Sequence, residues 1–385
     1  MDKLLIFYIF FLIDISNSKD YNIYMKAIII LTIFFQISFN KALAQSKSLY
    51  NKQYVKFQRI LKKKIEAPKL INKKQFKKVK VAVIDTGVDL NNPFLNQEGR
   101  YPASIDDKNG HGSHVAGIIS LLTQNNKMIE IIPYNYYNQD HSGKDNLESL
   151  LVQLKKAIKD NVDIINISGG GPEPSKREKE LIELARKKGI IIVTASGNES
   201  TDLDNIIKCY FMCNSPFAVN QYKYYPASYG LSNIISVSNY VNRKRVENSS
   251  NIGKETVTLG TYGTNIPSFN KKFSTRPKYM TGTSMATPII TSAIAQLKQR
   301  YPFLKLYQIK HILKVNSIKD KNTQYGFFSY YSFINWMNKD YSYFDLNPNN
   351  TLVDLMNTGY FNEFIIEIDK TNPKVMKKPF MKGLL

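Results

Sequence analysis

The 385-residue sequence is poor in cysteine, with only two, and no CxxC pair or zinc-type cluster occurs in it. Long apolar runs are also missing: the two near the N-terminus fall short of the roughly 20 residues that a membrane-spanning helix needs. Hydrophobic residues make up 43% and charged residues 22%. This composition excludes a disordered chain, a collagen-like fibre and a polytopic membrane protein, and it leaves ample material for a buried core.

Acidic residues are scarce, since 53 Lys and Arg stand against 31 Asp and Glu and give a net charge of +22. Such an excess suggests binding to nucleic acid or to a membrane surface. However, residues 45–80 hold twelve Lys and one Arg against the single Glu66, a net +12, and show little apolar periodicity. We therefore predict that residues 45–77 form a basic flank or short pro-segment rather than a folded face, and we predict no nucleic-acid partner. Contact of this flank with an anionic membrane surface stays open.

The N-terminal residues have the pattern of an export signal. Met25-Lys26 precedes an apolar run that ends in Ala42-Leu43-Ala44, which matches a basic region, an apolar region and a small-x-small cleavage site. We predict a signal peptide within residues 1–44, cut before Gln45, with Met25 as an alternative start. The alternative is an uncleaved membrane anchor. Either way, the prediction is a secreted or cell-envelope protein.

The two cysteines, Cys209 and Cys213, are four residues apart. In an exported protein they could close a small disulfide loop, which would add less stability than closing a long one. Two separate thiols are the alternative.

From about residue 79, short apolar runs alternate with helical patterns. Strands are expected at 79–84, 128–132, 162–167, 190–195 and 234–237, and helices at 113–122, 147–158, after Ser175, and at 284–300. Continuous apolar strands that alternate with helices indicate a parallel sheet covered on both faces. We predict an α/β fold with a doubly wound, mostly parallel sheet over residues 78–337. Residues 338–385 form an extension of unassigned role, with one strand candidate at 364–368.

Three of the expected strands end in residues suited to a site. Asp85-Thr86-Gly87 follows the first, Ser168-Gly169-Gly170-Gly171 the third, and Ser196-Gly197-Asn198 the fourth. Ligands of open parallel sheets bind in the crevice beyond the carboxyl ends of the strands. The sequence therefore predicts an active site there.

Two further motifs supply a base and a nucleophile. His111 lies between glycines at a helix start, and Ser284 lies in the first turn of another helix, where free amides and the helix dipole favour a developing oxyanion. A nucleophile needs a base, and the base needs an orienting acid, for which Asp85 is the candidate. The side-chain amide of Asn198 is a candidate donor to the same oxyanion.

With these motifs in place, the chain resembles the subtilisin family of serine proteases (subtilases) over about residues 78–337. The matching strings are VAVIDTGVDLNNPFL, NGHGSHVAGII, INISGGGP, ASGN, YPASYG and TGTSMATP. Several such strings in the right order are far more specific than one alone, and the order Asp, His, Ser is that of subtilisin.

The resemblance implies a role for each site residue. Ser284 would attack the scissile carbonyl, His111 would take and return the proton, and Asp85 would orient the imidazole. Asn198 and the Ser284 amide would bind the oxyanion. The backbone of Ser168, Gly169 and Gly170 would pair with an extended peptide as an added strand.

Some positions depart from the family pattern, namely Asn92, Ser113 and Thr261-Tyr262-Gly263. No loop shows a run of calcium ligands, so the family's structural calcium is doubtful, and the chemistry implies no cofactor. His111 and His114 with Asp85 could form a metal site, but no HExxH motif supports one, and we predict no metal ligands.

The sequence thus predicts an exported, monomeric serine endopeptidase that acts on proteins or peptides through an acyl-enzyme. One alternative is a catalytically silent peptide binder with the same fold. The other is a basic binding protein attached to a membrane surface.

Overall fold

The computed structural model of the chain describes residues 48–71, 77–95, 101–123, 128–137, 142–205, 222–271, 274 and 276–339. The predicted signal region 1–44, the cysteines Cys209 and Cys213, and the strand candidate at 364–368 lie outside the described residues. Two compact units are distinguished, residues 1–57 and 58–385, and the sheet belongs to the second.

The main sheet of the described chain has nine strands in the order β10-β11-β7-β5-β4-β3-β1-β2, with β6 paired to β5. All neighbouring pairs are parallel except β10 with β11 and β5 with β6. A second, two-stranded sheet joins β8 and β9. The strands are β1 (Val79–Asp85), β2 (Ile129–Asn135), β3 (Ile164–Ile167), β4 (Ile191–Ala195), β5 (Ile234–Asn242), β6 (Arg245–Val246), β7 (Leu259–Tyr262), β8 (Ile266–Ser268), β9 (Lys278–Met280), β10 (Ser317–Ile318) and β11 (Phe327–Phe328).

Helices lie between the strands along the chain. They are α3 (His111–Leu122), α4 (Gly143–Lys159), α5 (Lys176–Lys187), α6 (Thr283–Arg300), α7 (Leu306–Val315) and α8 (Tyr330–Asn338), with short 3-10 turns η2 (Ala103–Ile105) and η3 (Ala227–Tyr229).

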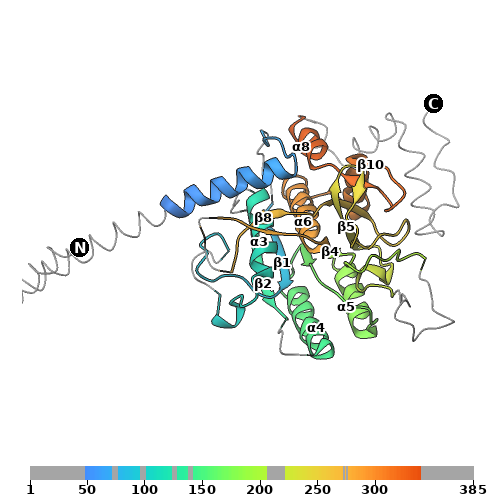
Figure 1. Cartoon of the computed structure of the whole chain (residues 1–385). Coiled ribbons are helices and arrows are strands. Elements are labelled where there is room, and N and C mark those ends of the chain that lie inside the picture. The colour runs from blue at the N-terminus through green and yellow to red at the C-terminus, as the bar shows by residue number, and fades with distance from the viewer. Residues whose placement is uncertain are drawn as a thin grey trace, which may run out of the picture. The chain divides into compact units, whose positions relative to one another are not determined.

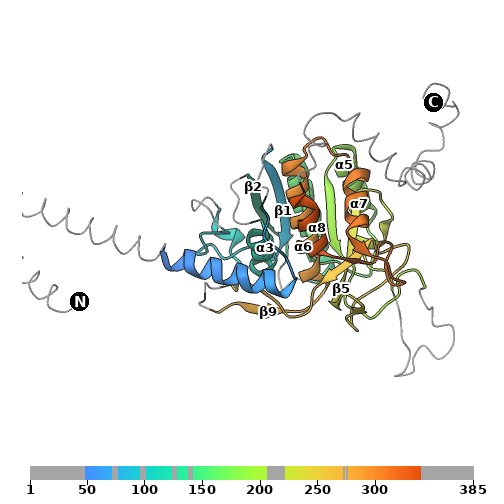
Figure 2. The same ribbon diagram turned by 90° about the horizontal axis from the view of Figure 1, so that it is seen from above.

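The helices cover both faces of the sheet (Figures 1 and 2). On one face, α4 and α5 bury Leu154, Ile158 and Ile182 in one cluster with the apolar side chains of β1, β3 and β4. On the other face, α3 and α6 lie against each other and against the strands. The predicted doubly wound α/β fold is confirmed.

Helix α6 is buried on nearly every side, since sixteen of its eighteen residues are buried. Thr287, Thr291 and Ser292 satisfy their hydroxyls by donating to backbone or side-chain acceptors. Gln296 donates to the carbonyl of Leu122 at the end of α3. A helix with no solvent face is a core element, and its N-terminal turn is therefore held in place by packing along its whole length.

Helix α5 begins and ends as its sequence predicts. The Ser175 hydroxyl accepts from the Glu178 N–H at 3.3 Å, which caps the N-terminus. The Glu178 carboxylate does not complete a capping box, because it accepts from the Tyr229 hydroxyl at 2.6 Å instead. Gly189 ends the helix with a φ of 73°, the left-handed conformation that glycine adopts without strain.

The basic segment near the N-terminus is helical over residues 48–64. From residue 58 on it belongs to the same unit as the sheet, and Leu61 and Ile65 are buried there, with Leu61 0% exposed. Gln58 donates to the carbonyl of Leu121 in α3 at 2.8 Å. The prediction that this segment has no folded face is therefore wrong from residue 58 onward. Among the described residues, no helix is both long and apolar enough to cross a membrane.

Candidate active site

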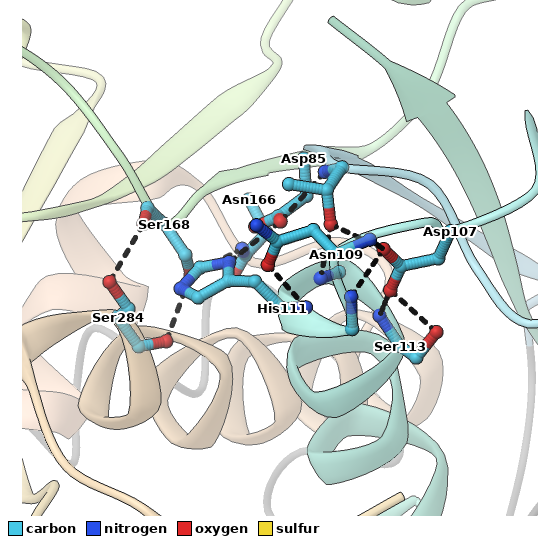
Figure 3. Close-up of polar contacts among 11 residues, drawn as sticks. Asp85, Asp107, Asn109, His111, Ser113, Asn166, Ser168 and Ser284 are labelled. Carbon is cyan, nitrogen blue, oxygen red and sulfur yellow. Dashed lines mark hydrogen bonds and ion pairs between the residues drawn. The ribbon is translucent and has the colours of Figure 1, made fainter. Parts of the chain in front are cut away.

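The carboxyl ends of β1, β3 and β4 lie side by side, because β3 pairs with both of the other strands. Asp85 ends β1, and the segments that start with Ser168 and Ser196 directly follow β3 and β4. The N-termini of α3 and α6 meet this edge and bring His111 and Ser284 to it (Figure 3). The structure thus gathers the predicted residues Asp85, His111 and Ser284 at the carboxyl edge of the sheet.

Asp85 and His111 form the acid–base pair of the site. The Nδ1 atom of His111 lies 2.7 Å from Oδ1 of Asp85, and the Asp85 side chain is only 4% exposed. The same carboxylate oxygen accepts from the Thr86 N–H. Burial lowers the pKa of His111, but the charge of Asp85 and the hydrogen bond to it outweigh burial, so the pKa is raised from its ordinary 6.5.

Asp107 fixes the start of α3, the turn that carries His111. Its buried carboxylate accepts five hydrogen bonds: from Thr86 Oγ1, from the N–H groups of Asn109, Gly110 and Ser113, and from the Ser113 hydroxyl. The first amides of a helix have no intrahelical acceptor, and here side chains supply the acceptors. The sequence analysis did not single out Asp107.

The loop after β1 and the start of α3 approach each other closely. A Cβ on Gly112 would lie 2.2 Å from the carbonyl oxygen of Gly87. Gly87 itself has a φ of 98°, and a Cβ there would lie 2.2 Å from the Ile105 carbonyl oxygen. Glycine is required at both positions for His111 to come within reach of Asp85.

We expect Asp107→Asn to destabilise the fold and to lower activity. An amide has one acceptor oxygen, so it leaves buried donors unpaired, which costs on the order of 2–3 kcal/mol. Urea unfolding of the variant in an inactive Ser284→Ala background, to avoid self-digestion, measures this loss. Asp106→Asn is the matched control, because the Asp106 carboxylate accepts no hydrogen bond from the residues that the structure describes. Equal unfolding midpoints for the two variants would refute the role of Asp107.

Ser284 lies in the first turn of α6 and is hydrogen-bonded to Ser168, the first residue of the segment that follows β3. Its hydroxyl donates to the backbone carbonyl of Ser168 at 2.8 Å, and the Ser168 hydroxyl donates to the Ser284 carbonyl at 3.0 Å. The Asn166 amide donates to the same Ser168 hydroxyl. In the described structure, therefore, Ser284 is bonded to Ser168 and not to His111, whose ring points toward the start of α6 (Figure 3).

Asn198 is oriented by the residue before the serine. Its side-chain oxygen accepts from the Thr283 N–H at 3.0 Å and from the Thr283 hydroxyl at 3.2 Å. This assigns the carbonyl end of the amide to Thr283 and leaves its NH₂ group for another acceptor. The Ser284 N–H is a first-turn amide of α6 and has no intrahelical acceptor. The two oxyanion donors predicted from the sequence, the Asn198 NH₂ group and the Ser284 N–H, are thus both without an acceptor in α6. Thr283 orients Asn198 and is not among the residues predicted from the sequence.

The backbone of Gly169 and Gly170 is open for pairing. Among the described residues, no backbone hydrogen bond is formed by either glycine, whereas Gly171 pairs in both directions with Tyr225 at 2.8 and 3.0 Å. An extended segment with unpaired donors and acceptors can receive a further strand.

His114 plays no part in this site. It is fully buried, its Nε2 lies 3.0 Å from the Lys278 carbonyl oxygen, and burial lowers its pKa to about 3. A neutral, buried imidazole that is hydrogen-bonded to backbone is structural. In the part of the chain that the structure describes, no three His, Cys, Asp or Glu side chains gather as a metal site would.

Comparison with known proteins decides the family. The sequence profile of the Subtilase family matches residues 76–333, which is most of the folded chain. The chain belongs to the subtilase family. Subtilases are serine endopeptidases that need no cofactor for their chemistry, and this one has their motifs and their fold.

Among its curated relatives, this subtilase is 31% identical to the minor extracellular protease Epr of Bacillus subtilis over 270 residues. That match covers 66% of this chain and 38% of Epr, so the chain spans about two fifths of Epr's length. It is also 31% identical to the major intracellular serine protease of Bacillus subtilis over 255 residues, covering 61% of this chain and 73% of the relative.

Solved structures agree on the fold. The subtilase resembles a lanthipeptide protease with a TM-score of 0.57 and 21% identity, covering 74% of this chain and 95% of the other. It resembles the epidermin leader peptide processing serine protease EpiP of Staphylococcus aureus with a TM-score of 0.54 and 21% identity, covering 68% of this chain and 76% of the other. Similarity at this identity shows the fold alone.

Proposed function

We propose that this subtilase is an exported serine endopeptidase that hydrolyses protein or peptide substrates through Ser284, His111 and Asp85. The observation that carries the proposal is the buried carboxylate of Asp85 at 2.7 Å from Nδ1 of His111, beside a serine in the first turn of α6. We place the catalytic unit at residues 78–337, preceded by the basic segment 45–77, which packs on this unit from residue 58 onward, and we propose that the protein acts as a monomer.

The proposed reaction starts with a change of hydrogen-bond partner. The Ser284 hydroxyl leaves the Ser168 carbonyl and donates to Nε2 of His111, which Asp85 holds in the tautomer that has its proton on Nδ1. As Oγ bonds to the scissile carbonyl carbon, His111 takes the proton, and the Asp85 carboxylate stabilises the imidazolium.

The negative charge that develops on the carbonyl oxygen is met by the NH₂ group of Asn198 and the N–H of Ser284. When the carbon–nitrogen bond breaks, His111 gives its proton to the leaving amine and an ester on Ser284 remains. A water molecule then attacks the ester while His111 takes its proton, and the proton returns to Ser284 as the acid product leaves.

Substrate alignment follows from the open backbone of Gly169 and Gly170. A peptide laid beside these glycines as an added strand would use main-chain hydrogen bonds, which accept any sequence. The carbonyl to be attacked would then stand between Ser284 and Asn198.

Export is proposed from the basic, apolar and small-x-small pattern up to Ala44, and Epr is named as an extracellular relative. The intracellular relative shows that the family functions in both compartments. The N-terminal sequence of the protein recovered from its native medium or envelope tests this, since a mature chain that starts at Gln45 supports export with cleavage.

A serine-directed fluorophosphonate tests the proposed nucleophile directly. The reagent should modify one residue, and peptide mass spectrometry should place the adduct on Ser284, with loss of casein hydrolysis in step. A folded protein that neither reacts nor cleaves casein would instead be the silent peptide binder. Casein hydrolysis without modification of Ser284 would refute the assignment.

A further inference from the structure

The ring of Tyr224 lies between two of the glycine-containing segments of the site. A Cβ on Gly170 would lie 2.6 Å from Cε1 of Tyr224, and a Cβ on Gly197 would lie 2.8 Å from its Cδ2. One edge of the ring therefore contacts the segment after β3 and the other edge contacts the segment after β4. A Cβ at Gly170 would also meet the Tyr225 carbonyl oxygen at 2.2 Å, and one at Gly197 would meet Asn251 and Glu199 side-chain atoms at 2.4 Å, so both positions require glycine and the ring fits closely between them.

If the proposed function holds, the Tyr224 ring lies where the substrate places the side chain of the residue before the scissile bond. The residue on the N-terminal side of the scissile bond has its carbonyl carbon at Ser284 and its carbonyl oxygen at Asn198. Its backbone runs beside Gly169 and Gly170. Its side chain must then project between the segment 168–170 and the segment 196–198, which is the space that the Tyr224 ring enters.

The backbone that carries the ring is held by its neighbours. The Tyr224 carbonyl accepts from the Ser228 N–H, and its N–H donates to the Ser228 hydroxyl. Tyr225, the next residue, pairs in both directions with Gly171. These bonds fix the backbone of Tyr224 to the same segment that would bind the substrate.

A second anchor holds the other end of this turn. The Tyr229 hydroxyl donates to the buried carboxylate of Glu178 at 2.6 Å and accepts from the Ser175 N–H at 2.8 Å. The rings of Tyr225 and Tyr229 also contact each other, with centroids 4.7 Å apart. The turn from Tyr224 to Tyr229 is thus tied to α5 and to the segment after β3, which fixes the backbone from which the Tyr224 ring projects between Gly170 and Gly197.

We propose that Tyr224 determines the cleavage preference of this enzyme by filling the space for the residue before the scissile bond, so that only a small side chain such as alanine, glycine or serine is accepted there. A larger side chain would have to displace a ring that is packed between two backbone segments. In the family's chemistry this changes which bonds are cut and leaves the acyl transfer itself unaltered.

The test uses the full-length protein and a peptide series that differs only at the residue before the cleaved bond, with Ala, Leu, Phe or Lys. Fluorophosphonate titration counts the active molecules in every sample. The wild type should cleave the Ala peptide at least ~10-fold faster in kcat/KM than the Phe peptide, since single-methylene differences already change kcat/KM by about that much in fitted sites.

Tyr224→Ala should raise the Phe-to-Ala ratio of kcat/KM by at least ~10-fold. Tyr224→Phe keeps the ring and should keep the preference for Ala. Tyr222→Ala is the matched control, because Tyr222 is 57% exposed and two residues away, and its ratio should equal that of the wild type. If Tyr224→Ala does not react with the fluorophosphonate, Tyr224→Leu is measured in its place, and the expected change in the Phe-to-Ala ratio has the same direction but is smaller.

Two results would overturn the inference. One is a wild type that prefers Phe or Leu. The other is a preference for Lys that is unchanged in Tyr224→Ala, which would assign selection to the exposed carboxylate of Glu199. Either result, if it depends on Ser284, leaves the proposed function intact. Absence of cleavage and of fluorophosphonate reaction in the folded wild type would instead contradict the proposed function itself.

Discussion

Replacing Ser284 by alanine is expected to lower kcat for peptide hydrolysis by roughly six orders of magnitude, the loss known for removal of the nucleophile from subtilisin itself. The variant keeps the oxyanion donors, because Asn198 is oriented by Thr283 and the backbone N–H of residue 284 is unchanged. Substrate binding should therefore survive while acyl transfer is lost. The measurement is hydrolysis of a fluorogenic peptide together with its affinity.

The control for this variant is Ser332→Ala. Ser332 is an exposed serine in the first turn of α8, so it matches Ser284 in residue type and helix position but lies outside the site. Its activity should equal that of the wild type. If Ser284→Ala keeps more than about a hundredth of the wild-type rate, another residue must be the nucleophile.

Replacing Asp85 by asparagine should lower kcat by about 10⁴-fold while leaving the fold in place. The amide of the new residue would turn its NH₂ group or its oxygen toward Nδ1 of His111, and in the first case the imidazole is forced into the tautomer that cannot accept the serine proton. It also lacks the charge that stabilises the imidazolium. Asp106→Asn, from the nearby loop, is the control and should leave kcat unchanged.

The pH dependence gives a second measurement on the same pair. His111 acts as a base only when it is neutral, so wild-type activity should fall as the pH drops through its pKa, which lies above 6.5. Without the charge of Asp85, burial still lowers the pKa of His111, but the main opposing attraction is gone. The acidic limb of the pH–rate profile should therefore shift to lower pH in Asp85→Asn. A limb that stays in place would show that another group titrates.

The sheet and the main site residues could be predicted from the sequence because their signals are local. A buried parallel strand is a short apolar run, and the residue that follows it lies at the carboxyl edge by geometry alone. Asp85, Ser168 and Asn198 each directly follow or lie just beyond such a run. The start of α3 at His111 and of α6 next to Ser284 also agree with the expected helix starts within two residues.

The helix in the basic segment was missed although a signal was present. Tyr54, Phe57, Leu61 and Ile65 follow one another at intervals of three and four residues, which is one face of a helix. The many lysines between them dominate the composition and conceal this spacing. Charge alone therefore does not distinguish a solvated tether from a helix whose apolar residues, such as Leu61 and Ile65, are buried.

The residues that position the site could not be predicted because their partners are distant in the sequence. Asp107 accepts four of its five hydrogen bonds from residues 109–113, but the bond that ties this turn to the end of β1 comes from Thr86, 21 residues away. Tyr224 lies more than fifty residues from Gly170, so no local pattern relates the two. Such contacts depend on tertiary packing.

The burial of α6 on all sides has a consequence for how chain length can vary in this protein. One residue added inside the helix would rotate everything after it by about 100°. Sixteen of the eighteen residues pack against other parts of the protein, so such a rotation would break most of these contacts. Insertions and deletions should thus be tolerated in the surface turns and not between Thr283 and Arg300, so the length of this helix is fixed by its packing.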